Sequence, residues 1–177
     1  MPDAVVDVCG QVVEEALART GPAEIVIGIP SFNHADAIAP VVAAIEADLR
    51  RHFPSRRSLI VQSDGGSTDG TPERAFELVS RPEGVLQVAC PIYAAQRLSE
   101  PYHGFPGKGA AIRTLFTAAD RLGAQACVVL DLDTRSAETD WLARLVRPVL
   151  DHGYDYVAPR YTVRYDHGGG LARGIVY

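Results

Sequence analysis

The sequence has few cysteines and no long hydrophobic run, and each absence excludes a class of protein. Its three cysteines, Cys9, Cys90 and Cys127, are far apart, odd in number and without C-x-x-C spacing, which argues against a disulfide framework and a zinc knuckle. No apolar run approaches the ~20 residues that span a bilayer, and the N-terminus lacks the basic start and apolar core of a signal peptide. We therefore predict a cytoplasmic protein with reduced thiols and no membrane span.

The composition is that of a water-soluble globular protein. Hydrophobic residues make up 47% and charged residues 22% of the 177 residues, which argues against disorder. The net charge of -5 disfavours a broad electrostatic contact with nucleic acid, so an anionic ligand would need a local cationic or metal site. The length predicts one domain over residues 1–177, with 1–22 as a leading helix.

Strand-like and helix-like segments alternate along the chain. Short β-branched runs predict buried strands, and apolar residues at helical spacing predict helices between them. Strands are expected at 24–30, 59–61, 85–89 and 126–130, with 154–159 as an option for another, and helices at 38–49, 71–79, 112–119 and 141–150. This alternation predicts an α/β fold with an open, mostly parallel sheet flanked by helices.

In such sheets the ligand lies beyond the carboxyl ends of the strands, and two polar clusters follow the first two strands. In the cluster 30–36, small polar side chains and turn backbone would suit a base or ribose. On this segment alone, the favoured interpretation is that Asn33 or another short polar residue caps the next helix. In the cluster 64–71, two glycines allow close backbone approach, and Asp64 offers an acceptor to a base. Thr71 as N-cap with Pro72 at the first helical position explains only the end of that segment.

Two further clusters carry charge. Gly107-Lys108-Gly109 precedes a helix, where a lysine fits best if a diphosphate is bound, although a solvated lysine is about as good an explanation. Asp131-Leu132-Asp133 follows the fourth strand, and extended backbone would point both carboxylates into one space. Such a pair suits Mg²⁺ or Mn²⁺ holding a diphosphate, and the alternative is one capping and one solvated aspartate.

Taken in this order, the clusters resemble the nucleotide-sugar-binding half of GT-A fold, family-2-like glycosyltransferases over roughly residues 25–177. Pro30-Ser-Phe-Asn33 is similar to their first-strand motif, Asp64-Gly-Gly-Ser-Thr-Asp-Gly-Thr71 to their D-x-G-S-T-D-x-T turn, and Asp131-Leu-Asp133 to their D-x-D motif. Gly107-Lys108-Gly109 narrows the resemblance to glucosyl-3-phosphoglycerate, mannosyl-3-phosphoglycerate and glucosylglycerate synthases. The implied fold is the Rossmann-like GT-A sheet.

The resemblance also implies a role for each matching position. Asp133 is the implied ligand of Mg or Mn, and Arg173 with the glycines before it is implied to bind the acceptor. Leu171 stands where an arginine for the acceptor's phosphate is expected, so a phosphoglycerate, a glycerate or another small acid or polyol are all options. The residues implied to bind the nucleotide sugar are Pro30, Ser31, Asn33, His34, Asp64, Gly65, Lys108, Asp131 and Leu132, and those implied at the acceptor are Gly169, Gly170 and Arg173.

The resulting hypothesis is a metal-dependent transferase that moves a hexose from a UDP- or GDP-sugar to a small hydroxy-acid or polyol. A sugar-phosphate nucleotidyltransferase is the second option, and a nucleotide-binding fragment without turnover is the third. We expect a C-terminally truncated chain, because it ends within the apolar run 175–177. If the chain is complete, such an end would favour a homodimer.

Overall fold

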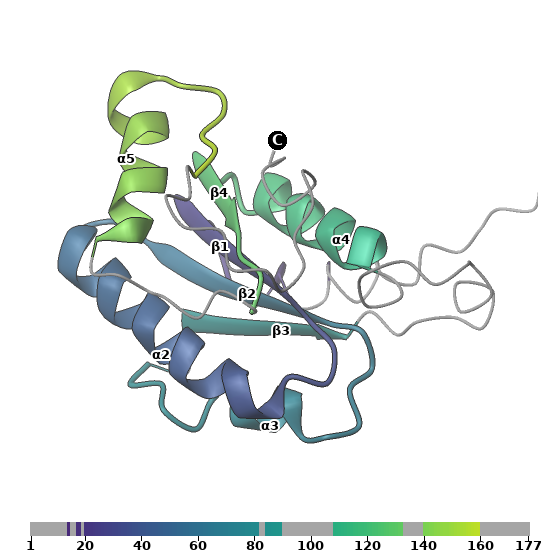
Figure 1. The fold of residues 1–177 in the computed structure, drawn as a ribbon. Helices are drawn as coiled ribbons and strands as arrows, with labels where there is room; N and C mark the ends of the chain where they lie inside the picture. Colours follow the sequence, from purple (N-terminus) through teal and green to yellow (C-terminus); the bar gives the residue numbers. More distant parts are fainter. Residues whose placement is uncertain are drawn as a thin grey trace, which may run out of the picture.

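The centre of the molecule is a four-stranded, all-parallel sheet with the strand order β3-β2-β1-β4 (Figure 1). The computed structural model describes residues 14, 17, 18, 20–81, 84–89, 108–132 and 140–159. The strands are β1 (Ile25–Ser31), β2 (Ser58–Asp64), β3 (Val85–Ala89) and β4 (Ala126–Val129). The helices are α2 (Ala35–His52), α3 (Thr71–Arg74), α4 (Lys108–Arg121) and α5 (Trp141–His152). The predicted α/β fold with a parallel sheet is confirmed.

The central strand β1 is buried along its whole length. It pairs with β2 so that Ile25 lies opposite Ser58 and Ser31 lies opposite Asp64, and its other edge pairs with β4. A strand covered on both faces carries apolar side chains on both, which explains why Ile25–Ser31 reads as a nearly continuous apolar run rather than as an alternating one.

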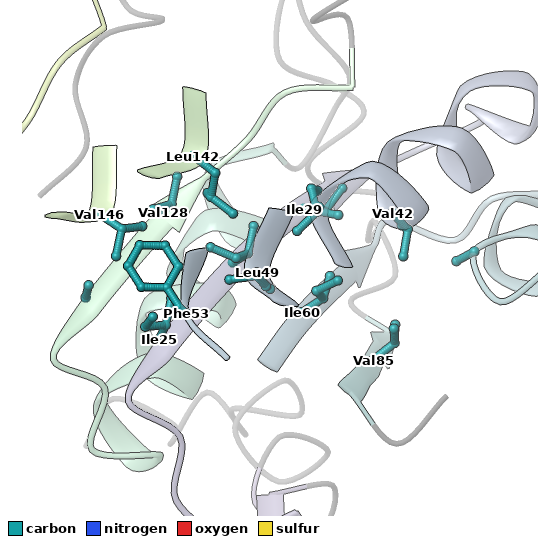
Figure 2. Packing of buried hydrophobic residues seen from close by; sticks show 14 of the residues in the cluster. Ile25, Ile29, Val42, Leu49, Phe53, Ile60, Val85, Val128, Leu142 and Val146 are labelled. Atoms are coloured by element: carbon teal, nitrogen blue, oxygen red, sulfur yellow. The ribbon is translucent and has the colours of Figure 1, made fainter. Parts of the chain in front are cut away.

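Helices cover both faces of the sheet (Figure 1). On one face, α2 and α5 pack over a core that includes Ile25, Ile60 and Leu142, and Figure 2 shows these side chains in one cluster with Phe53 from the end of α2. On the other face, α4 packs over a second core built around Val26, Val61 and Leu115. The period of two along each strand therefore divides its side chains between two separate cores.

The close approach of α4 to β1 depends on Gly28. A Cβ atom at this position would lie 2.8 Å from Cδ1 of Leu115, which is fully buried. Real side chains do not tolerate such a contact, so the missing side chain of Gly28 lets α4 lie against the middle of the sheet.

Two predictions of local structure differ from the observed elements. The helix predicted for 71–79 ends at Arg74, and i→i−3 hydrogen bonds such as Phe76 N to Glu73 O follow it. This tighter winding places Phe76 and Val79 on one side against the core, because it has three residues per turn. The strand suggested for 154–159 is wrong: this segment has no strand structure, and its exposed Tyr154 and Tyr156 gain no burial. Of the leading helix predicted for 1–22, the described residues Glu14, Leu17 and Ala18 are helical.

Within the described part of the chain, none of the helices has the length and apolar character needed to cross a membrane.

Candidate functional site

The polar clusters after β1 and β2 meet at the carboxyl edge of the sheet. Ser31 and Asp64 are opposite each other at the ends of the two strands, and the N–H of Gly65 donates to the carbonyl oxygen of Ser31 at 2.9 Å. The pairing of β1 with β2 thus continues one residue past the strands. The parallel topology, rather than local sequence, brings these two distant segments together.

The carboxylate of Asp64 organises the glycine loop that follows β2. Its Oδ1 accepts hydrogen bonds from the hydroxyls of Ser31 (2.9 Å) and Ser67 (2.7 Å). Its Oδ2 accepts from the backbone N–H groups of Gly66 (2.9 Å) and Ser67 (2.8 Å). A carboxylate offers about four acceptor positions, so these contacts use them all. Asp64 is 7% exposed, and in this structure it holds the loop rather than presenting a vacant acceptor.

The loop after β2 also holds the N-terminus of α2. The backbone N–H of Ala35, the first residue of α2, donates to Oδ2 of Asp69 at 3.0 Å. The N–H of His34, the N-cap residue, donates to Oγ1 of Thr71 at 2.8 Å. The capping acceptors of α2 therefore come from a segment more than thirty residues further along the chain, and they satisfy helix N–H groups that would otherwise have no partner.

Asn33 does not cap α2 as the segment alone suggested. Its backbone has φ of 54°, a left-handed conformation that asparagine adopts more readily than most residues. From there its Oδ1 accepts from the N–H of Thr68 at 3.0 Å, and its N–H donates to Oγ of Ser67 at 2.9 Å. The N-cap of α3 is likewise Gly70, with φ of 86°, instead of the predicted Thr71. Asn33 ties the two loops together.

The pKa of the Asp69 carboxyl reflects this capping role. Desolvation pushes the pKa upward, but hydrogen bonds from the Thr71 hydroxyl and from the backbone N–H groups of Ala35 and Thr71 outweigh it and lower the pKa below its ordinary value. Hydrogen bonds to the ionised form have this effect. The loop therefore stabilises a charged Asp69 beside the positive end of α2.

An ion pair joins the two charged clusters. Nζ of Lys108, the first residue of α4, lies 2.5 Å from Oδ2 of Asp131, two residues beyond the end of β4. Both side chains are partly buried, with 31% and 25% of their area exposed. Because α4 begins and β4 ends at this edge, the pair lies on the same edge as the ends of β1 and β2.

The remaining predicted site residues fall into two groups. Leu132 is 4% exposed and lies in the core shared with α2 and α5, so its side chain packs against other apolar residues, while Pro30 and Gly65 are buried at the ends of β1 and β2. The predicted metal ligand Asp133 and the predicted acceptor residues Gly169, Gly170 and Arg173 lie outside the described residues. Among the described residues, no three His, Cys, Asp or Glu side chains are grouped so as to hold a metal ion.

The structure adds polar residues that sequence reasoning missed. Ser67 and Asp69 belong to the motif 64–71, which predicts no role for them individually, yet they hold the loop and the helix N-terminus. Gln62 comes directly after the predicted strand 59–61 and lies inside the observed β2, whereas Gln87 lies inside both the predicted and the observed β3. A glutamine in an otherwise apolar strand needs a hydrogen-bond partner when it is buried, and for Gln87 this signal was available from the sequence.

A pocket of about 450 Å³ lies elsewhere, between the end of α2 and the outer side of α5. Its polar lining includes His52, Asp140 and Arg144, and Nε2 of His52 is 2.9 Å from Oδ1 of Asp140. None of the predicted site residues lines it.

Comparison with known proteins leaves the family of the chain open. No protein-family model matches the sequence, and no curated protein shows a significant match. Among solved structures, the chain is similar to one described as "Crystal Structure of a Mycobacterial Protein", with 24% sequence identity and a TM-score of 0.47. The match covers 85% of this chain and 42% of that chain, so the present chain spans less than half of that protein.

Proposed function

We propose that the chain is the nucleotide-sugar-binding part of a hexosyltransferase that uses a UDP- or GDP-sugar as donor. The observation that carries this proposal is the position of the Lys108–Asp131 ion pair, on the edge where the loops after β1 and β2 are hydrogen-bonded to each other. Ligands of open α/β sheets bind at this edge. The motif resemblance supplies the chemical class of ligand, and the arrangement of the motifs along one edge supports it.

Lys108 has the chemistry that a leaving nucleoside diphosphate requires. Negative charge grows on the diphosphate as the bond to the sugar breaks, and a fixed ammonium group nearby stabilises that charge. Asp131 orients the ammonium in the absence of ligand. With a nucleotide bound, Asp131 would face the ribose or the sugar, and Lys108 would turn toward the phosphates.

The base and ribose would be held by the linked loops 30–34 and 64–65. Because the protein already uses the Asp64 carboxylate fully, contacts from exposed backbone and from Asn33 and His34 suit the base better than a direct bond to Asp64. In this arrangement the loops would bind the base through their shape and through neutral polar contacts, without a direct contact to a carboxylate.

Mg²⁺ or Mn²⁺ fits the oxygen donors of the D-x-D segment, of which Asp131 lies at the described edge and Asp133 is the proposed ligand. When bound, the cation would supply additional positive charge at the diphosphate. A small hydroxy-acid or polyol is the proposed acceptor, with Gly169, Gly170 and Arg173 as its proposed binding residues.

Calorimetric titration with UDP and with GDP, each with and without Mn²⁺, tests the donor site. We expect one of the two to bind in a metal-dependent way, and Lys108→Met and Asp133→Ala to weaken binding at least about tenfold, the size expected for losing a charge-assisted contact. Arg121→Met is the matched control, since it removes one positive charge from the other end of α4.

Two outcomes oppose the proposal. If the folded chain binds neither nucleotide, or if Lys108→Met and Arg121→Met weaken binding equally, the site assignment is wrong. A transfer assay with the matching nucleotide-glucose and glycerate, measured as released nucleoside diphosphate, then separates a hexosyltransferase from a fragment that only binds.

A further inference from the structure

A chain of hydrogen-bonded polar side chains, buried or half-buried, crosses the sheet and ends at the candidate site. The amide Nε2 of Gln87 on β3 donates to Oε1 of Gln62 on β2 at 2.8 Å. Nε2 of Gln62 then donates to Oγ of Ser31 on β1 at 3.0 Å. The hydroxyl of Ser31 donates to Oδ1 of Asp64 at 2.9 Å. Three neighbouring strands are thus linked to the carboxylate that holds the glycine loop.

The direction of this chain is fixed by the chemistry of its ends. A carboxylate only accepts, so the proton of Ser31 must point to Asp64, and Ser31 must then accept from an amide group. Gln87 fixes which end of the Gln62 amide faces Ser31. The two N–H groups on Nε2 of Gln87 donate to the carbonyl oxygen of Pro72 and to Oε1 of Gln62. Oε1 of Gln62 therefore faces Gln87, and Nε2 of Gln62 faces Ser31. Each link determines the next.

The burial of the chain makes its geometry costly to change. Gln62 and Ser31 are fully buried, and a buried polar group that loses its partner pays the full cost of desolvation. Fully satisfied buried networks fix one arrangement of the groups at their end. Here the group at the end is Asp64, whose other three hydrogen bonds come from Gly66 and Ser67.

We propose that Gln62 is a positioning residue for the loop 64–67, acting through Ser31 on Asp64, with Gln87 as its support. Its effect on ligand affinity rests on the proposed function, whereas its effect on the loop does not. In the absence of the Gln62 amide, the Ser31 hydroxyl is free to rotate away from Asp64. The carboxylate then loses its one hydrogen bond from β1, and the Gly66 and Ser67 amides lose a fixed acceptor.

Amide hydrogen exchange measured by NMR tests this role without a ligand. Gln62→Leu keeps the volume and removes both hydrogen bonds. We expect the Gly66 and Ser67 amides to exchange about tenfold faster, as for the loss of one ordinary hydrogen bond. Gln62→Glu should be at least as fast, because a second carboxylate competes for the Ser31 proton. Ile60→Val is the matched control, since it trims the same face of β2 without touching a hydrogen bond.

One result would overturn the proposal: the Gly66 and Ser67 amides of Gln62→Leu exchange at the wild-type rate, and Gln62→Leu lowers the free energy of unfolding by the same amount as Ile60→Val. Gln62 would then contribute to packing alone. Gln87→Leu, at a half-buried position, should give a smaller acceleration of exchange at the same two amides, and it decides the matter if Gln62→Leu does not fold.

Nucleotide affinity is measured on the same variants. If amide exchange is faster but nucleotide affinity is unchanged, Gln62 positions the loop without affecting ligand binding, and that part of the proposal is overturned. If the wild type binds no nucleotide, the proposed function is refuted, whereas the exchange result still tests the role of Gln62 in the loop.

Discussion

At the residue scale, Lys108 is the only lysine in the chain. Sixteen other basic residues are arginines, yet the position beside Asp131 carries a compact ammonium group. A guanidinium would bind a single aspartate in a flat, two-pronged geometry and release it less readily, whereas an ammonium moves between acceptors as a point charge. A single lysine at the carboxyl edge therefore suits a group that exchanges partners.

Asp131→Asn should change the free energy of unfolding by less than about 1 kcal/mol, because ion pairs that are partly open to solvent contribute little. Reversible urea unfolding measures this. Reductive methylation with ¹³C-formaldehyde labels only the N-terminus and Lys108, and the Lys108 methyl signal should shift in the variant. A loss above about 2 kcal/mol would instead make the pair part of the fold.

Cys127 on β4 provides a second residue-scale prediction, because burial raises the pKa of its thiol from 9.0 to about 11. A thiol reacts as the thiolate, so in a Cys9→Ser/Cys90→Ser variant we expect almost no reaction with a disulfide reagent at pH 8 until the protein is unfolded. Fast reaction of the folded variant would contradict the partial burial of Cys127 against the core under α4.

The same shift in pKa affects stability at high pH. The unfolded chain loses the thiol proton above pH 9 while the folded chain keeps it, so this contribution to stability is fully present below pH 9 and is lost as the pH rises toward 11.

At the element scale, the contact of α4 with β1 depends on a missing side chain. Gly28→Ala places a Cβ atom against Leu115, and overpacking of this kind costs about 1–3 kcal/mol. Leu115→Ala alone leaves a cavity and costs about 2–5 kcal/mol. In the double variant the new methyl group enters the space that Leu115 vacates, so urea unfolding should give less than the sum of the two losses. If the losses of the two single variants simply add in the double variant, the strain of Gly28→Ala does not come from its contact with Leu115.

The cap on α2 gives a prediction with a pH signature. Asp69→Ala should lower stability by about 1 kcal/mol, the usual effect of losing a helix cap. Since the pKa of Asp69 is lowered in the folded state, the wild-type advantage is present above the ordinary carboxyl pKa and is lost as the pH falls through the lowered value. Unfolding curves of wild type and variant should converge in acid, and a constant gap between them would mean that the charge is irrelevant.

The elements were predictable where periodicity decided them. The strand runs and the helices α2, α4 and α5 follow from apolar spacing, and their observed bounds differ from the predicted ones by a few residues. One failure came where the decisive contact is distant in sequence, and another where local propensity misled. Asn33 looked like a cap because the acceptors that replace it, on Asp69 and Thr71, belong to another loop. The exposed segment after α5 looked like a strand because tyrosine and valine favour strands even where no burial follows.

At the scale of the whole molecule, the candidate site draws on elements from both faces of the sheet. Ser31 and Asp64 extend from the core under α2 and α5, and Lys108 begins the helix over the other core. The sequence identified these clusters one at a time, and only the strand order β3-β2-β1-β4 places them along one edge. The spacing of residues along the sequence predicted which residues belong to the site. Which of them lie next to each other depends on the strand order, and the strand order depends on packing across the whole chain.

A ligand that bridges both halves of this edge should stabilise the whole domain rather than one loop. With the nucleotide that binds in the presence of Mn²⁺, at 100 times its dissociation constant, we expect about 2.7 kcal/mol of added stability in urea unfolding. Because the metal is proposed to complete the diphosphate site, EDTA should remove most of this gain, and Asp133→Ala should show little of it. Fluorescence of Trp141, the single tryptophan, at the start of α5 and far along the chain from the loops 30–34 and 64–71, should report the same midpoint shift as circular dichroism. Different shifts by the two probes would show that the ligand stabilises only one side of the sheet, and the site would then have to be reassigned to that side.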